Sequence, residues 1–200
     1  MRFYLATNNA HKVEEFRLLA AAAGPVLTIA SARMLGGMPA VAENTGSFVG
    51  NARQKAAALR RALPDGSWAL ADDSGLCVAA LDGAPGVDSA IYAGPQADAA
   101  ANLAKLVDAM QAVPAGGRGA SFVCVLAVVN GQGEERIFEG RCEGRLLAEP
   151  AGAGGFGYDP LFVPAGESRS FAELSEAEKN RISHRARAWA KLVAWGCSTI

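Results

Sequence analysis

Two adjacent carboxylates, Asp72 and Asp73, follow a short apolar run in the first half of the chain. The run Trp68–Ala71 predicts a strand, and the Ser74-Gly75 pair predicts a turn that ends it. Open α/β sheets place their chemistry at the ends of strands, and paired carboxylates on a rigid strand suit hard divalent cations such as Mg²⁺. The alternative is an Asx turn that only caps the strand.

A second candidate site lies near the N-terminus, where Lys12 falls in the first turn of a predicted helix. A cation is unfavourable at this end of a helix unless an anion offsets it. Free backbone N–H groups, together with the side chains of Thr7, Asn8 and Asn9, make the loop resemble a phosphate cradle, although the P-loop pattern is absent. Alternatively, Asn8 or Asn9 only caps the helix and Lys12 extends into water.

Three further polar residues lie around the start of the next predicted helix. Glu43 precedes that helix and would reach the same cation as Asp73 if the loop and the strand end converge. Asn51 and Lys55, one turn apart on the helix, either face the phosphates or belong to a solvated polar face.

The glycine-rich segment Gly152–Pro160 contains two aromatic residues, Phe156 and Tyr158, together with Asp159. Glycines allow the backbone to approach a ligand closely, and aromatic rings offer flat faces for a base. We therefore interpret this segment as a nucleobase-binding loop. A plain mobile loop is the alternative.

The C-terminal segment supplies three further donors, because Lys179 lies about one helical turn before His184 and Arg185. Lys179 and Arg185 can neutralise phosphate or bind a keto oxygen, and His184 can donate to a ring carbonyl. A solvated basic helix face is the alternative interpretation.

The elements that must position these residues alternate between strands and helices. Strands are predicted over Phe3–Ala6, Val26–Ala30, Trp68–Ala71, Ser121–Val129 and Glu135–Arg141. Helices are predicted around Val13–Ala23, Val49–Leu63, Ala97–Met110 and, from a capping box at Ser175, through Val193 as one helix. Asn130-Gly131 is a strong hairpin signal, so the last two strands should pair antiparallel. The pattern predicts a mixed sheet covered by helices.

Composition excludes several classes of function. The 200 residues allow one substantial core, and 19 basic against 20 acidic residues give no field that would favour nucleic acid or an anionic membrane. The four cysteines form no C-x-x-C pair, and no apolar segment is long enough to span a bilayer. The N-terminus turns polar too soon for a signal peptide. We expect a cytoplasmic protein that binds neither nucleic acid nor membrane.

Taken together and in order, five motifs resemble the inosine triphosphate pyrophosphatase family over nearly the whole chain. The motifs are Ala6-Thr7-Asn8-Asn9 through Lys12 and Glu15, ADDSGL at 71–76, Gly83-Ala84-Pro85-Gly86, GGFGYDP at 154–160, and Ser183-His184-Arg185. The resemblance implies a single two-lobed α/β domain over 1–200, with a long mixed β-sheet flanked by helices and an active cleft between the lobes. It also implies a homodimer.

The implied activity is Mg²⁺-dependent hydrolysis of noncanonical purine nucleoside triphosphates (ITP, dITP, XTP) to the monophosphate and pyrophosphate. This activity keeps deaminated purines out of DNA and RNA. By position, the resemblance assigns the metal to Glu43 and Asp73, and the role of proton acceptor to Asp73. Substrate binding is assigned to Thr7, Asn8, Asn9, Ala10, His11, Lys12, Ser74, Phe156, Gly157, Tyr158, Asp159, Lys179, His184 and Arg185.

Two positions depart from the family pattern. Asn44 stands where many relatives have a second acidic residue, and Ile91 replaces the basic residue usual before Tyr92. Selection against ATP would rest on donors meeting the 6-keto oxygen, whereas rejection of GTP has no residue-level account.

Two rival functions are a metal-dependent nucleotide hydrolase with another substrate or another bond cleaved, and a nucleotide-binding module without activity.

Overall fold

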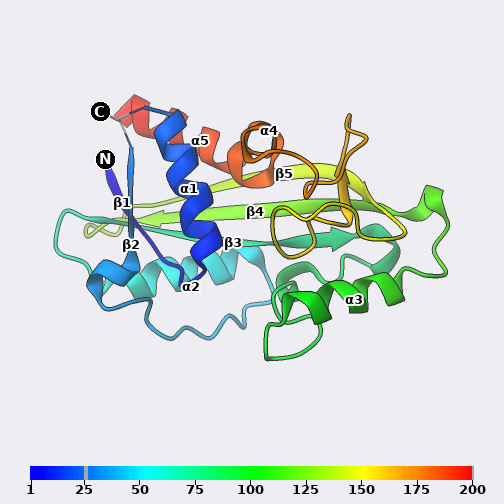
Figure 1. Ribbon diagram of the computed structural model, residues 1–200. Coiled ribbons are helices and arrows are strands. Elements are labelled where there is room, and N and C mark those ends of the chain that lie inside the picture. Colours follow the sequence, from blue (N-terminus) through cyan, green and yellow to red (C-terminus); the bar gives the residue numbers. More distant parts are fainter. Residues whose placement is uncertain (25–26, 200) are drawn as a thin grey trace. The chain divides into compact units, whose positions relative to one another are not determined.

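The computed structural model of the protein describes residues 1–24 and 27–199. A six-stranded mixed sheet has the order β2-β1-β3-β4-β5-β6 (Figure 1). The strands are β1 (Arg2–Leu5), β2 (Thr28–Ser31), β3 (Trp68–Val78), β4 (Gly119–Val129), β5 (Glu135–Leu146) and β6 (Phe162–Pro164). The α-helices are α1 (Ala10–Ala22), α2 (Phe48–Arg60), α3 (Ala99–Ala109), α4 (Glu176–Ile182) and α5 (His184–Thr199). The predicted mixed α/β sheet is confirmed.

The chain forms two compact units. Unit 1 comprises Met1–Asp73, Cys124–Gly140 and Arg185–Ile200, and unit 2 comprises Ser74–Val123 and Arg141–His184. The predicted cleft between two lobes stays a prediction.

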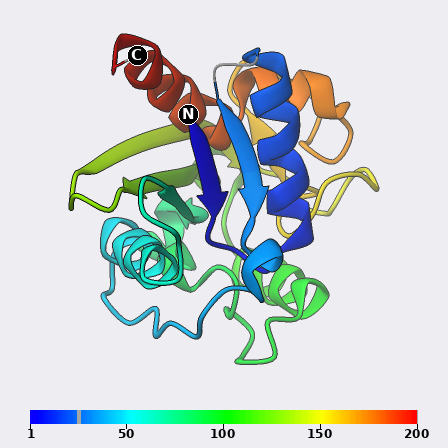
Figure 2. The ribbon, with the colours of Figure 1, turned by 90° about the vertical axis from the view of Figure 1, so that its left-hand side faces the viewer.

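Unit 1 is built on parallel strands. β1 pairs in parallel with both β2 and β3, in a register that aligns Leu5 with Leu70. In this unit, α1 and α2 lie on opposite sides of β1 and β2 (Figure 2). The core joins α1 to α5, with Phe16 and Trp189 in edge-to-face contact at 5.9 Å. Val26, the first residue of the predicted second strand, lies outside the described residues.

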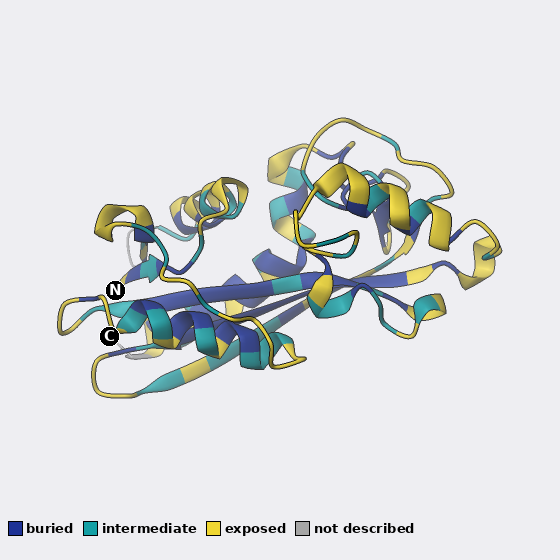
Figure 3. Ribbon diagram, turned by 90° about the horizontal axis from the view of Figure 1, so that it is seen from below, coloured by how far each residue is buried: buried dark blue, intermediate teal, exposed yellow. Residues whose placement is uncertain are grey.

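Unit 2 has an aromatic core in which Phe122 contacts the rings of Phe162 and Phe171. The helix predicted over Ala97–Met110 is found as α3, with Asp98 as its N-cap. The predicted hairpin is also found, because β4 and β5 are neighbours joined by a short turn at 130–134. The strands β3 and β4 are largely buried, whereas β5 is mostly half-buried or exposed, and the loops and outer helix faces are exposed (Figure 3).

The predicted end of the acidic strand is wrong. β3 does not stop at Ser74-Gly75 but continues to Val78. Leu76 and Val78 are fully buried in the core of unit 2, so burial of their side chains keeps the chain extended beyond the two aspartates. Asp72 and Asp73 therefore lie within a strand and not at its tip.

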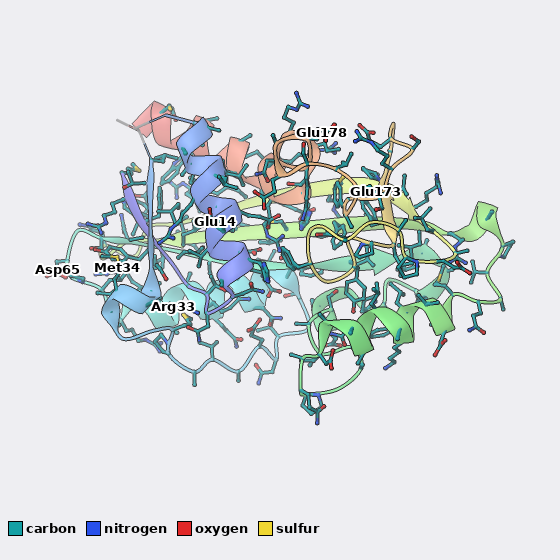
Figure 4. The ribbon with its side chains drawn as sticks, in the orientation of Figure 1. Glu14, Arg33, Met34, Asp65, Glu173 and Glu178 are labelled. Carbon is teal, nitrogen blue, oxygen red and sulfur yellow. The ribbon has the colours of Figure 1, made fainter. Side chains whose placement is uncertain are left out.

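The prediction of one C-terminal helix is also wrong. The capping box at Ser175 is present and opens α4, on which Glu178 is labelled in Figure 4, but the helix ends before Ser183. Ser183 has an extended backbone (φ −66°, ψ 159°) and directly precedes α5. Serine is favoured at a position just before a helix, and the apolar spacing on either side does not reveal the single extended residue.

Candidate active site

The acidic pair lies where β1 ends and β3 continues. β1 stops at Leu5, and the next amide, that of Ala6, donates to the Leu70 carbonyl at 2.7 Å. Beyond that point β3 carries Asp72 and Asp73 past the end of its parallel neighbour. The carboxylates thus occupy the carboxyl edge of the β2-β1-β3 portion, where parallel sheets bind ligands, although β3 itself runs on.

Adjacent side chains of a strand point to opposite faces of the sheet, and this separates the two aspartates. Asp72 is paired with Lys12 near the start of α1 and with Arg185 in α5, whereas Asp73 is paired with Lys55 of α2. α1 and α2 lie on opposite sides of the parallel strands, which agrees with this alternation (Figure 2). Each carboxylate therefore has its own set of cations.

Asp72 is a fully buried counter-ion. Its Oδ2 atom accepts from Lys12 Nζ at 2.9 Å and from Arg185 Nε at 3.2 Å, and Arg185 Nη1 also donates to Glu15 Oε2 at 2.8 Å. Although burial opposes the charged form, Lys12 and Arg185 hold the pKa of Asp72 well below its ordinary value. Asp72 stays ionised and is a poor candidate for a base.

The loop before α1 uses much of its hydrogen-bonding capacity internally. Asn9 caps α1, with Oδ1 accepting from the amides of His11 (2.9 Å) and Lys12 (3.3 Å). Asn8 Oδ1 accepts from the Met38 amide, and Thr7 Oγ1 accepts from the Asn9 amide. Asn9 therefore caps α1, as the first half of the alternative interpretation states.

Lys12 does not extend into water, because its side chain is only 16% exposed and its ammonium group pairs with Asp72. The negative charge that the helix start requires thus comes in part from the protein itself. Asn8, Asn9, Ala10 and His11 are exposed, as a loop that receives a ligand requires.

Asp73 has the properties of a base. Its Oδ1 atom accepts from Lys55 Nζ at 2.5 Å, whereas its buried Oδ2 atom has no hydrogen-bond partner among the described residues. Burial, only partly offset by Lys55 and Lys12, raises the pKa of Asp73 to about 6. A carboxylate with a pKa near neutrality and an open oxygen can accept a proton from a bound water.

Glu43 converges with Asp73, which the residues alone left open and the family resemblance implied. Lys55 Nζ contacts Glu43 Oε2 at 2.8 Å while it also contacts Asp73, so one ammonium group joins the two carboxylates. Burial opposes ionisation of Glu43, but Lys55 lowers the pKa of this carboxyl below its ordinary value. Lys55 is buried, so the solvated-face interpretation of this residue is wrong.

The donor set fits a magnesium ion held together with a polyphosphate. Within the described residues, no group of three or more His, Cys, Asp or Glu side chains is arranged to hold a metal ion. Mg²⁺ does not need one, because it is usually held by one or two carboxylates plus substrate phosphates and water. Glu43 and the open oxygen of Asp73 supply such a pair, and Asn44, which hydrogen-bonds to Gln54, adds no carboxylate.

In unit 2, Asp159 organises the glycine-rich loop. Its Oδ2 atom accepts from Lys179 Nζ at 2.7 Å and from the Phe156 amide at 2.8 Å. Gly155 has φ +67°, and a Cβ there would collide with the Asp159 carboxylate, so the tight approach requires glycine. Lys179 Nζ lies 5.1 Å from the centroid of the Phe156 ring. Asp159 thus ties the backbone of this loop to the ammonium group of Lys179.

Other predicted substrate residues differ in their surroundings. Phe156 and Gly157 are partly exposed, and Ser74 is half-buried on β3. Tyr158 belongs to the core, where its hydroxyl donates to the Ser89 carbonyl at 2.9 Å, so its ring does not offer a face to a base. His184 is buried and stacks on Phe122, with centroids 4.7 Å apart.

The predicted basic face of Lys179, His184 and Arg185 does not form within one helix. Lys179 is in α4 and pairs with Asp159, whereas Arg185 is in α5 and pairs with Asp72 and Glu15. The break at Ser183 separates them. Sequence reasoning also left Lys55 out of the predicted metal and substrate residues, although its position beside the apolar stripe of Ala52, Ala56 and Leu59 could have indicated a buried ammonium group.

Comparison with known proteins agrees with these observations. The model of the Ham1 family matches residues 3–195. The chain is 62% identical to a dITP/XTP pyrophosphatase of Opitutus terrae, with 98% of each chain covered, and 46% identical to one of Streptomyces coelicolor, with 96% of this chain and 95% of the relative covered.

Solved structures give the same result. The Staphylococcus aureus Ham1 protein aligns with a TM-score of 0.86 and 32% identity, with all of both chains covered. The dITP/XTP pyrophosphatase of Mycobacterium abscessus aligns with a TM-score of 0.76 and 41% identity, with 96% of this chain and 98% of that chain covered. The family resemblance seen in the sequence is confirmed, and the chain belongs to the Ham1 family.

Proposed function

We propose that this protein hydrolyses noncanonical purine nucleoside triphosphates (dITP, ITP and XTP) to the nucleoside monophosphate and pyrophosphate. The proposal is supported by the names of its relatives and by one observation in particular. Asp73 has a buried oxygen without a hydrogen-bond partner among the described residues, and its pKa is raised. It lies with Glu43 around the ammonium group of Lys55 in unit 1. This arrangement suits activation of a water molecule next to a polyphosphate.

Asp73 orients the attacking water and accepts its proton. The water oxygen forms a bond to the α phosphorus while the bond from that phosphorus to the oxygen bridging to the β phosphorus breaks, so pyrophosphate leaves. The exposed loop from Thr7 to His11 binds phosphate oxygens through its polar groups. Lys12, held by Asp72, adds positive charge beside this loop.

Glu43 and Asp73 would hold Mg²⁺, as argued from their convergence and from the open oxygen of Asp73. When bound, the ion supplies charge neutralisation and polarisation of the phosphate group. Catalysis by the protein is then mainly electrostatic positioning, since the residues around the phosphates are already ordered by ion pairs.

Base recognition belongs to unit 2. Phe156 offers a partly exposed ring beside the Lys179 ammonium group, and both are held by Asp159. The 6-keto oxygen of a deaminated purine can accept a hydrogen bond from the Lys179 ammonium group or from a backbone amide of this loop. The 6-amino group of adenine cannot accept one and leaves these donors unpaired, which disfavours dATP. Arg185 pairs with Asp72 and Glu15 of unit 1, so we assign it to the support of Asp72.

The resemblance also leads us to propose a homodimer in the cytoplasm. Within the described residues, none of the helices is both long and apolar enough to cross a membrane. Light scattering of the purified protein tests the dimer.

Product analysis tests the activity. Wild-type protein incubated with dITP and Mg²⁺ should release inorganic pyrophosphate and dIMP in equal amounts. Orthophosphate as the sole inorganic product would refute the cleavage site, and equal kcat/KM for dITP and dATP would refute the base assignment. Omission of Mg²⁺ should abolish turnover, and unchanged turnover without a divalent cation would refute the metal requirement.

A further inference from the structure

Lys55 occupies an unusual place for a lysine, between two carboxylates assigned to a metal. Its side chain is 11% exposed, and its Nζ atom lies 2.5 Å from Asp73 Oδ1 and 2.8 Å from Glu43 Oε2. These two oxygens come from a strand and from a loop 30 residues earlier in the sequence. An ammonium group is the compact point charge that can bring both oxygens together.

The loop that carries Glu43 is fastened to the same helix that carries Lys55. Both the amide and the hydroxyl of Thr45 donate to Oδ1 of the buried Asn51, at 3.2 and 2.8 Å. Asn51 lies one turn before Lys55 on α2. α2 therefore fixes the loop two residues after Glu43 and holds its carboxylate through Lys55.

Gly50 makes this attachment possible. A Cβ at this position would collide with Oγ1 and Cβ of Thr45, so a larger residue would push the loop off the helix. Gly50 and Asn51 of α2 thus lie against Thr45, and Lys55 of the same helix contacts Glu43. Glycine inside a helix costs stability, so its presence is explained by the close approach of the loop.

Asp73 keeps one oxygen open despite this packing. Lys55 uses Oδ1, while the buried Oδ2 has no hydrogen-bond partner in the described part of the chain. A buried, unpartnered carboxylate oxygen beside a second carboxylate is a place for a ligand cation. The ammonium group of Lys55 thus contacts one oxygen of each carboxylate and leaves Oδ2 of Asp73 without a partner among the described residues.

We propose that Lys55 is a positioning residue whose ammonium group holds Glu43 and Asp73 together in the free protein, and that a divalent cation displaces it in order to bind both carboxylates. The proposal rests on the proposed function of these two residues as metal ligands. Lys55 would keep the carboxylates converged, so that substrate and cation meet a formed site. The same ammonium group would weaken binding of the cation alone, since the two positive charges repel.

The experiment is a titration of the nucleotide-free protein with Mn²⁺, followed by electron paramagnetic resonance. Lys55→Met and Lys55→Gln should bind Mn²⁺ more tightly than wild type, by roughly 10-fold or more, because a positive charge a few ångströms away is removed. Lys55→Arg, which keeps the charge, should not. Arg53→Met is the matched control: it removes one positive charge from the same helix, at an exposed pair with Glu135, and should change affinity by less than about two-fold.

Unchanged or weaker Mn²⁺ binding in both neutral variants would overturn the proposal. Equal tightening in Arg53→Met would also overturn it, since that result indicates a general field effect. If a neutral variant unfolds without metal, the rise of Tm with Mn²⁺ concentration gives the same comparison. The outcome is separate from the product assay, because Mn²⁺ binding by these variants is measured whether or not dITP is cleaved to pyrophosphate.

Discussion

Replacing Asp73 by asparagine should stabilise the protein while it removes activity. Asparagine has the shape of a protonated aspartate but cannot ionise. The pKa of Asp73 is raised from 3.8 to about 6, so the folded protein disfavours its charged form. A difference of about two pKa units corresponds to about 3 kcal/mol, and the side chain is only 8% exposed, so solvent screens little of it.

The sign of the pH dependence follows from proton binding. Between about pH 4 and pH 6 the folded wild type binds more protons at Asp73 than the unfolded chain, so this group makes stability fall as the pH rises through that window. Asp73→Asn cannot ionise, so its stability does not fall in this way. At pH 8 Asp73→Asn should therefore unfold with a free energy up to about 3 kcal/mol higher than wild type, or a Tm roughly 6–12 °C higher. Near pH 4 most of the difference should disappear.

The assay is urea or thermal unfolding of both proteins at pH 8 and pH 4 without divalent cations. Asp72→Asn is the matched control, because it makes the same substitution one residue away in the same strand. Asp72 has a lowered pKa and neutralises the buried Arg185 and the partly buried Lys12, so its loss should destabilise the fold by about 3–5 kcal/mol. Equal or lower stability of Asp73→Asn at pH 8 would refute the inference that the fold disfavours the charge of Asp73.

Three further outcomes are expected. The kcat/KM of the wild type for dITP, measured at Mg²⁺ concentrations below saturation, should fall as the pH drops through the acid range, because the pKa of Asp73 is raised in the metal-free protein and protonation removes its role as proton acceptor; a flat profile down to pH 5 would contradict that role. Asp159→Asn should raise KM for dITP about ten-fold or more and change kcat less, since Phe156 and Lys179 lose a charged partner, and an unchanged KM would exclude this role. Arg118→Met should lower the free energy of unfolding by about 3 kcal/mol or more, because its buried guanidinium donates to the carbonyls of Met110, Val113, Leu146 and Leu147. The exposed Arg145→Met on β5 is the control for Arg118, and equal effects of the two substitutions on unfolding would contradict that account.

The periodic elements could be predicted from sequence because their signals are local. The apolar spacing around Phe16 indicated α1, and Asn130-Gly131 indicated the hairpin between β4 and β5. The course of β3 beyond Asp73 could not be predicted in this way, because a Ser-Gly pair favours a turn locally and only burial of Leu76 and Val78 in a distant core keeps the strand extended. Tertiary packing outweighed turn propensity at that point.

The residues of the site could be predicted from sequence only in part. The ordered motifs contain Asp73 and the glycine-rich loop, and the resemblance that they carry added Glu43 by position. The structure brings Glu43 and Asp73 to one ammonium group. The partner of each charge could not be predicted, since Arg185 reaches Asp72 across 113 positions of sequence. Sequence spacing on a helix suggested that Arg185 acts with Lys179, and the extended residue Ser183 removed that relation.

The alternation of Asp72 and Asp73 across the sheet makes this segment intolerant of any change in length. A single residue inserted or deleted within Trp68–Ala71, just before the two aspartates, would turn each carboxylate to the other side. The permanently ionised counter-ion and the proton acceptor would then exchange their neighbours, and Lys12 and Lys55 would each meet the wrong acid. Substitutions in this strand can be graded in severity, whereas a slip of one position would abolish the chemistry on both faces at once.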